Sequence, residues 1–185
     1  MTSQEDINWI NSTLQGDVRA FEKIVQKYSD MVFTIALRIV GHREEAEEIA
    51  QDVFINIYKS LHVFQHKAKF STWVYRIAYN ASINCTRKAK KVIELVEWNE
   101  SVHTDYISTS NEEDNDERKI ILDSIETLDE IDQIIVTLYY YDNTPVKEIA
   151  TITQLSESNI KSRLLRSRTK LQKVLSKNWQ NMPME

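Results

Sequence analysis

Apolar side chains recur every three or four residues along most of this chain, which is the spacing of an amphipathic α-helix. In the first half the pattern predicts four helices, over residues 4–14, 17–40, 43–61 and 71–90. Asp17 can accept hydrogen bonds from the free N–H groups at the start of the second helix, and Gly41 suits a left-handed residue after its end. These helices predict an N-terminal helical bundle.

The second half repeats the helical rhythm in shorter pieces. It predicts one helix or a broken pair over residues 119–141, a short helix over 146–153 and a last helix over 157–177. We expect Thr144 to cap the short helix with Pro145 in its first turn, and Ser156 to cap the last helix. A tight turn at Gln154 separates these two helices, and a basic helix after such a turn is typical of a helix-turn-helix domain.

Composition narrows the fold class to all-α. The 185 residues include only two glycines and two prolines, too few for a glycine-rich phosphate loop or for a sheet with many turns. The single cysteine, Cys85, excludes an internal disulfide and a multi-cysteine zinc site, and it suits a reducing cytoplasm. No apolar run approaches the roughly 20 residues of a membrane span, and the acidic N-terminus is not a signal peptide. We therefore expect a cytoplasmic protein without membrane insertion.

Charge is sorted into blocks, although the net charge is only −5. Residues 67–91 and 159–177 each hold seven Lys or Arg and no Asp or Glu, whereas residues 94–117 hold nine acids and no Lys or Arg. From residue 97 this acidic stretch has no helical periodicity and is rich in Ser, Thr and Asn. The chain is thus predicted to form two small helical domains, 1–92 and 118–178, joined by an acidic flexible linker over 93–117.

The last helix has the residue types of a DNA-reading helix. Such a helix contacts base edges with its N-terminal residues and phosphates further along. Here small polar residues stand at the start and basic residues follow. The alternative is a solvated basic face on a C-terminal helix, which would normally mix charges of both signs.

The segment 64–91 interleaves basic and aromatic residues, a combination typical of single-stranded nucleic-acid binding. Unpaired bases stack on rings for about 1–3 kcal/mol each while cations follow the backbone. The alternative is that most of these rings, Trp73 above all but also Phe64 and Phe70, belong to the core.

The third helix carries five acids and no base over residues 44–52. Its acidic face is open to three interpretations: a solvated surface, a metal site or a protein dock. A di-metal bundle would need two Glu-x-x-His motifs, whereas the only one, Glu100–His103, lies in the linker. Cys85 has no catalytic partner in the sequence and is expected to be a small packed residue. Nothing here supports an enzyme, a metal or a cofactor.

Three successive segments carry a resemblance: EEAEEIAQDVFINIYKSL, FSTWVYRIAYNASINCTRKAKK and IETLDEIDQIIVTLYYYDNTPVKEIATITQLSESNIKSRLLRSRTKLQKVL. In this order they resemble the signature segments of the extracytoplasmic-function (ECF) sigma factors of bacteria, over about residues 10–92 and 118–176. The resemblance implies two helical domains, called regions 2 and 4. It also implies a protein that binds core RNA polymerase, directs it to promoter DNA and helps to open the duplex.

The resemblance also assigns roles to individual residues. The surface that docks on the clamp helices of the largest polymerase subunit would comprise Glu47, Glu48, Gln51, Asp52, Val53 and Asn56. The loop that captures a flipped base of the −10 element would hold Phe64, His66, Lys67 and Lys69, and the melting helix Trp73, Tyr75, Arg76, Tyr79, Asn80, Arg87 and Lys88. The −35 element would be read by Ser156, Glu157, Ser158, Asn159, Lys161, Ser162, Arg163 and Arg166, with Arg168 and Lys170 gripping the backbone.

Two features of this chain depart from the family pattern. The family usually has glycine where this chain has Gln154, and a glutamine in a left-handed conformation costs of order 1 kcal/mol. The linker is unusually acidic, and we hypothesise that it shields the basic surfaces of the free protein. The family often has an anti-sigma factor that clamps both domains, which makes such a protein a further expected partner.

Two other classes of function compete with this interpretation. A stand-alone helix-turn-helix regulator would use residues 1–92 for dimerisation or effector binding, but it would normally pair two reading heads and no dimer seam is visible. A helical adaptor without DNA contact is opposed by the two basic segments that contain no acid.

Overall fold

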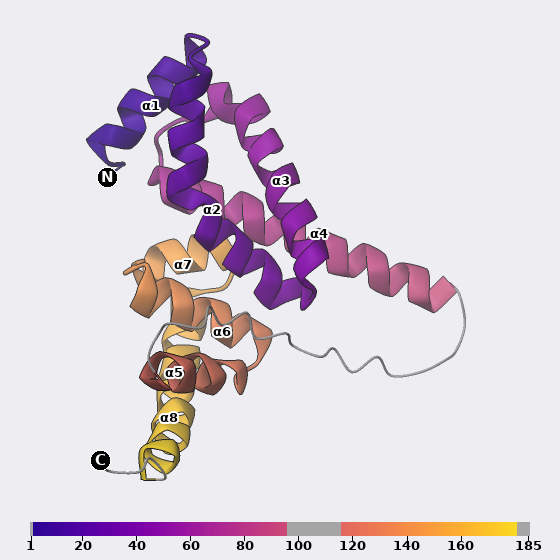
Figure 1. Cartoon of the computed structure of the whole chain (residues 1–185), viewed down its shortest axis with the longest axis vertical. Helices are drawn as coiled ribbons and strands as arrows, with labels where there is room; N and C mark the ends of the chain where they lie inside the picture. Colours follow the sequence, from indigo (N-terminus) through magenta and orange to yellow (C-terminus); the bar gives the residue numbers. More distant parts are fainter. Residues whose placement is uncertain (1, 96–115, 181–185) are drawn as a thin grey trace. The chain divides into compact units, whose positions relative to one another are not determined.

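The computed structural model describes residues 2–95 and 116–180, with side chains over 2–88 and 120–176. In this part of the chain the regular structure is entirely helical, which confirms the all-α class (Figure 1). The described helices fall into two compact units, one built on α1 to α4 and the other around α5, α6 and α8. The predicted linker lies outside the described residues, except that α4 and α5 extend into it to Leu95 and from Asp116.

The first unit contains the four predicted helices, which are α1 (Gln4–Leu14), α2 (Val18–Val40), α3 (Arg43–Ser60) and α4 (Phe70–Leu95). A short 3₁₀ turn, Leu61–Val63, follows α3. The helix α2 packs against each of the other three (Figure 1), and its apolar stripe supplies much of the core, including the fully buried Ile24 and Val32. The expected caps of α2 are confirmed: the Asp17 carboxylate accepts from Arg19 N at 3.0 Å, and Gly41 has φ 78°.

A lysine on α2 holds α1 in place. Lys27 Nζ donates to Asp6 Oδ1 at 2.9 Å and to Ser3 Oγ at 3.4 Å, and it lies 5.3 Å from the centre of the Trp9 ring. The Asp6 side chain is only 6% exposed, whereas that of Lys27 is 34% exposed. A buried carboxylate needs a compensating charge nearby. This ion pair therefore holds α1 against α2 in addition to the apolar contacts between the two helices.

The second unit contains α5 (Asp116–Glu126), α6 (Glu130–Val136), a π-helical turn at Thr137–Tyr141, α7 (Val146–Thr153) as far as Ala150, and α8 (Glu157–Gln180). The sequence predicted either one helix or a broken pair over residues 119–141. The structure shows a broken pair, because α5 ends at Glu126 and α6 begins at Glu130. The core of the second unit is aliphatic, with Ile134, Ile135, Leu138, Ile149 and Ile160 all fully buried. No helix in the described ranges is both long enough and apolar enough to cross a bilayer.

The N-terminus of α7 differs from the prediction. Thr144 does not cap this helix, because its buried hydroxyl donates to Asp142 Oδ2 at 2.5 Å instead. The cap is Pro145, whose carbonyl accepts from Glu148 N at 2.8 Å and from Ile149 N at 3.0 Å. Pro145 is thus the N-cap rather than a residue of the first turn, and the helix starts at Val146, as the sequence predicts.

The turn between α7 and α8 keeps a left-handed residue although this chain has no glycine there. Gln154 is left-handed, with φ 60° and ψ 24°, so the chain accepts the cost of about 1 kcal/mol that a side chain brings to this region. Ser156 caps α8 as expected, because its Oγ accepts from Asn159 N at 3.2 Å. The turn and cap together set the direction in which α8 leaves α7.

Replacing Lys27 by Met should loosen α1 from α2. The change leaves the Asp6 carboxylate buried without its cation, which costs about 1–3 kcal/mol. Amide hydrogen exchange over residues 4–14 should therefore accelerate by about tenfold for each 1.4 kcal/mol lost. Lys23→Met, at an exposed lysine one turn earlier on α2, is the matched control. Equal exchange rates in the two variants would contradict the role of the ion pair.

Candidate nucleic-acid and protein interfaces

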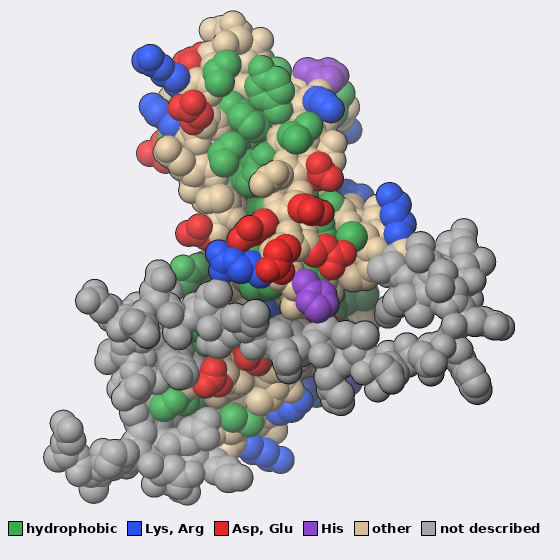
Figure 2. All heavy atoms as spheres, turned by 45° about the vertical axis from the view of Figure 1, so that its right-hand side comes forward, with side chains coloured by type: hydrophobic (Ala, Val, Ile, Leu, Met, Phe, Trp, Pro, Cys, Tyr) green, Lys and Arg blue, Asp and Glu red, His purple; other side chains and the backbone are tan. Residues whose placement is uncertain are grey.

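The acidic face of α3 is exposed, apart from one predicted residue. Glu47, Glu48, Gln51, Asp52 and Asn56 all lie at the surface, but Val53 is fully buried and belongs to the core. The prediction that Val53 contacts a partner at the surface was therefore wrong, because this position of α3 faces the core of the bundle. Figure 2 shows carboxylates gathered beside apolar side chains on the viewer's face of the first unit.

Two apolar side chains that the sequence analysis missed extend this face. Ile55 and Tyr58 are 50% and 48% exposed, and the Tyr58 ring meets Phe21 edge-on with centroids 4.9 Å apart. Both lie at helical spacing from Gln51, on the side of α3 opposite Val53. The spacing could have revealed them, but the rhythm of three and four also placed Tyr58 in the buried stripe. The face thus combines carboxylates with exposed apolar surface.

The carboxylates of this face differ in their own partners. Arg43 Nε donates to Glu47 Oε1 at 2.8 Å, a pair one turn apart on α3. Glu48 and Asp52 have no ion-pair partner in the part of the chain that the structure describes. They are the charges of this face that are available to a basic partner.

The structure corrects the predicted −10 residues at two aromatic positions. Phe64 and Tyr75 are only 9% and 4% exposed, so they pack in the core rather than presenting their rings. Phe64 contacts Phe70 and Trp73, with centroids 5.2 and 5.3 Å away, and Tyr75 lies 6.0 Å from the Tyr28 ring. The alternative that these rings form the core thus holds for these two positions and for Phe70, which is fully buried.

The other predicted residues of this segment remain accessible in part or in full. His66, Lys67, Arg76, Arg87 and Lys88 are exposed, and Lys69, Trp73, Tyr79 and Asn80 are half-buried. His66 has φ 53° and its ring lies 4.6 Å from the Phe64 ring, so the loop is anchored to the aromatic core. The segment therefore offers a basic track with Trp73 and Tyr79 as its accessible large rings.

Cys85 joins α4 to α3. Its thiol donates to Glu45 Oε1 at 3.0 Å, and this hydrogen bond, together with burial, raises the pKa of Cys85 to about 11. The neutral thiol is favoured, so the bond contributes to stability below about pH 9.0 and is lost as the pH rises through about 11. The side chain is half-buried rather than packed away. A protonated thiol is a poor nucleophile, and among the described residues no three His, Cys, Asp or Glu side chains gather to hold a metal ion.

The N-terminal half of α8 presents most of the predicted −35 residues to solvent. Ser156, Glu157, Ser158, Asn159, Lys161, Ser162, Arg166, Arg168 and Lys170 are exposed. Arg168 Nε donates to Tyr140 Oη at 3.0 Å, and Lys170 Nζ donates to the Thr127 carbonyl. Lys161 and Arg166 have no hydrogen-bond or ion-pair partner among the described residues, so they are the freest cations of this face.

Arg163 differs from the other predicted −35 residues of α8, because its side chain is largely buried in an ion pair. Its Nη1 donates to Asp132 Oδ1 on α6 at 2.6 Å, and the arginine side chain is only 24% exposed. With Nη1 on Asp132 and Nε on Asn159, this guanidinium keeps only part of its donors for a guanine, so the structure gives Arg163 a role within the domain that the sequence did not indicate, and base reading by Arg163 stays a prediction. Asp132 lies 31 residues away in sequence, which is why no local pattern pointed to it.

Leu165 is a residue of α8 that the sequence analysis missed. It is 64% exposed and lies on the same helical face as Ser158, Ser162 and Thr169. An apolar side chain at the centre of a polar helix face suits contact with a thymine methyl group. The sequence could have indicated this exposure, because Leu165 does not lie three or four residues from Ile160 or Leu164, which belong to the buried face.

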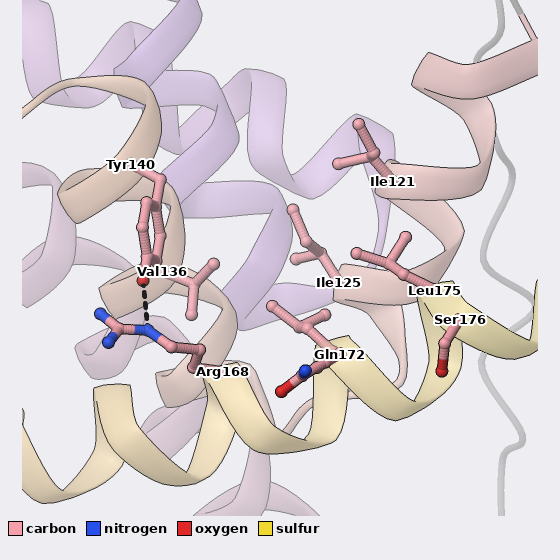
Figure 3. A pocket seen from close by; sticks show the side chains of 9 residues that line it. Ile121, Ile125, Val136, Tyr140, Arg168, Gln172, Leu175 and Ser176 are labelled. Carbon is pink, nitrogen blue, oxygen red and sulfur yellow. Dashed lines mark hydrogen bonds between the residues drawn. The ribbon is translucent and has the colours of Figure 1, made fainter. Parts of the chain in front are cut away.

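An apolar groove lies between α5, the end of α6 and the second half of α8 (Figure 3). It encloses about 580 Å³ and is lined by Ile121, Ile125, Val136, Leu171 and Leu175. The hydrogen bond from Arg168 to Tyr140 crosses one end of it. Arg168 thus borders both this groove and the exposed polar face of α8.

Comparisons with known sequences identify both units. Residues 24–92 match the family described as Sigma-70 region 2, and residues 118–171 match Sigma-70 region 4. The chain is 30% identical to the ECF RNA polymerase sigma factor SigW of Bacillus subtilis over 176 residues, which cover 90% of this chain and 94% of that protein. It is 27% identical to the RNA polymerase sigma-H factor of Pseudomonas aeruginosa, over 95% and 96% of the two chains.

A solved structure shares the fold. The sigma factor RpoE of Bartonella quintana, solved in complex with the anti-sigma factor NepR, superposes with a TM-score of 0.68 at 19% identity. The match covers 86% of this chain and 98% of the other.

Replacing Glu45 by Gln should make Cys85 react faster with iodoacetamide at pH 8. A glutamine amide accepts a weaker hydrogen bond from the thiol than a carboxylate does and carries no charge, so the pKa of Cys85 falls towards its ordinary value, and each unit of pKa gives about tenfold more thiolate. Glu48→Gln is the control, because Glu48 accepts no hydrogen bond from this thiol and raises its pKa less than Glu45 does. Mass spectrometry of the alkylated chain gives the rates, and the same rate for Glu45→Gln and wild type would refute the assigned cause.

Proposed function

The chain belongs to the ECF family of RNA polymerase sigma factors, and from this membership we propose how its two units share the work of promoter-specific initiation. The first unit, as region 2 over residues 1–92, binds core RNA polymerase and melts the −10 element. The second, as region 4 over 118–178, reads the −35 element, and residues 93–117 connect them. The observation that carries this proposal is the occurrence of both family matches, in this order, on one chain whose described helices fall into two compact units.

We propose that the exposed face of α3 binds the polymerase. Glu48 and Asp52 are available to basic side chains, while Ile55 and Tyr58 supply apolar area that a partner can bury. Complementary charge speeds association and fixes the register of docking, and burial of exposed apolar area favours the complex. Glu47, Gln51 and Asn56 complete this face, with Val53 beneath it as its support.

We propose that the basic track of α4 and the preceding loop holds the separated strand. The exposed cations of this segment, Lys67, Arg76, Arg87 and Lys88, follow the phosphate backbone. His66 on its anchored loop and the half-buried Trp73 and Tyr79 are the rings available to an unpaired base. The buried Phe64 and Tyr75 contribute by fixing these elements in place.

We propose that α8 enters the major groove with its N-terminal half. Ser158, Ser162 and Leu165 face the base edges, and Lys161 and Arg166 supply free cations beside them. Arg168 and Lys170 lie further along the helix, where a reading helix meets phosphates. The turn at Gln154 and the Ser156 cap start this half of α8 so that Ile160 and Leu164 pack in the core while its polar face is exposed.

Three further expectations follow from the family. The chain acts as an initiation factor without a catalytic step of its own. It works in the cytoplasm, where the polymerase is. An anti-sigma factor is a candidate partner, because the Bartonella relative was solved bound to one.

A stand-alone regulator is the second candidate, and reconstitution separates the two. Purified chain added to core RNA polymerase should give initiation at specific sites on a library of genomic fragments, whereas a stand-alone regulator would bind specific fragments without polymerase. Absence of any complex with polymerase would sink the sigma-factor proposal.

Asp52→Ala should weaken the complex with core polymerase by about tenfold, which corresponds to about 1.4 kcal/mol. The expected cause is the loss of an unpaired carboxylate from the docking face of α3. Asp30→Ala removes an exposed carboxylate from α2 and should leave the affinity unchanged. Fluorescence anisotropy with labelled chain measures both affinities, and an unchanged affinity for Asp52→Ala would contradict the assigned face.

Arg166→Ala should weaken promoter binding by the reconstituted holoenzyme while leaving polymerase binding unchanged. A free arginine that forks onto a guanine contributes about 1–3 kcal/mol of discrimination, so the preferred site should lose about 5- to 150-fold in affinity. Lys173→Ala, at an exposed lysine two turns further along α8, is the control and should have a smaller effect. If both variants lose the same affinity on every sequence tested, Arg166 contacts only phosphates.

A further inference from the structure

Three side chains from α6 and α8 form a hydrogen-bonded chain that ends at the tip of α8. Asp132 Oδ1 on α6 accepts from Arg163 Nη1 at 2.6 Å. The Nε of the same guanidinium donates to Asn159 Oδ1, one turn earlier on α8, at 3.1 Å. Arg163 therefore connects a carboxylate of α6 to an exposed amide in the first turn of α8.

The ion pair in this chain is well shielded from solvent. The side chains of Asp132 and Arg163 are 13% and 24% exposed, so their attraction is less screened than that of a surface pair. The guanidinium is planar and its donors are fixed in one fork. Holding Nη1 on Asp132 therefore also fixes the direction in which Nε points, towards Asn159.

These hydrogen bonds engage the oxygen of the Asn159 side-chain amide and leave its nitrogen available. Its Oδ1 accepts from Arg163, whereas its Nδ2 group has no partner among the described residues. An asparagine that reads adenine uses both groups, because it accepts from N6 and donates to N7. An asparagine with its oxygen engaged instead offers donors to the acceptors of a base edge, and guanine presents two neighbouring acceptors, N7 and O6.

We infer that Asp132 is a positioning residue for promoter reading: through Arg163 it orients the Asn159 amide so that its NH₂ group donates to a guanine edge. This inference rests on the proposed function of α8 as the −35 reading helix. It assigns to Asp132 and Arg163 a role in specificity although neither touches the base.

A double-mutant cycle with the reconstituted holoenzyme tests the coupling. Asp132→Asn and Asn159→Ala should each weaken binding to the preferred promoter by about 3- to 10-fold, and the double variant should bind no more weakly than Asn159→Ala alone. Tyr140→Phe is the control, since it removes a hydrogen bond to α8 that does not reach Asn159. Its effect should multiply with that of Asn159→Ala.

Base preference separates positioning from mere support of the fold. Selection from promoters with a randomised −35 element should show guanine favoured at one position by wild type, and adenine accepted there by Asp132→Asn. Arg163→Lys keeps a cation beside Asp132 and hence the thermal stability of the second unit, but it loses the fork to Asn159. It should show the same shift towards adenine with the other positions unchanged.

The outcomes distinguish failure of this inference from failure of the proposed function. If Arg166→Ala weakens promoter binding but Asn159→Ala does not, the inference is wrong and the reading helix stands. Multiplicative effects of Asp132→Asn and Asn159→Ala, or an affinity loss spread evenly over all sequences, would reduce Asp132 to structural support. If neither Arg166→Ala nor Asn159→Ala changes promoter binding, both the inference and the assignment of α8 fall.

Discussion

Each helix of this chain has one face to bury, and this constraint decides which side chains remain for its partners. In α3 the burial of Val53 turns Ile55, Tyr58 and the carboxylates outwards together. In α4 the burial of Tyr75 fixes the direction of Arg76 beside it. A side chain that packs in the core is not available to a partner. The core residues of each helix therefore determine which of its side chains can form an interface.

Tertiary ion pairs apply the same constraint to charge. Lys27 is held to α1 by Asp6, and Arg163 is held to α6 by Asp132, so each of these cations serves the fold. Arg166, one turn from Arg163 and of the same residue type, has no such partner in the described structure and stays available. The two arginines therefore differ in availability because only Arg163 lies beside a carboxylate that is distant in the sequence.

The local features of the fold could be predicted because their causes lie within a few residues. The helices of the first unit, the Asp17 and Ser156 caps and the left-handed Gly41 all follow from spacing and capping chemistry. The wrong prediction of a Thr144 cap and the role of Arg163 depend on Asp142 and Asp132, two side chains that the pattern of apolar residues does not relate to them. Aromatic residues were the other weak point, since a ring suits a core and a stacking surface equally well.

The pairing of Arg163 with Asp132 has a consequence for how ionic strength acts on this protein. A cation gains affinity for DNA at low salt because it displaces condensed counterions from a phosphate. Arg163 already has its counter-charge within the domain, so it displaces none. Counting basic residues along α8 therefore overstates how steeply salt weakens its hold on DNA.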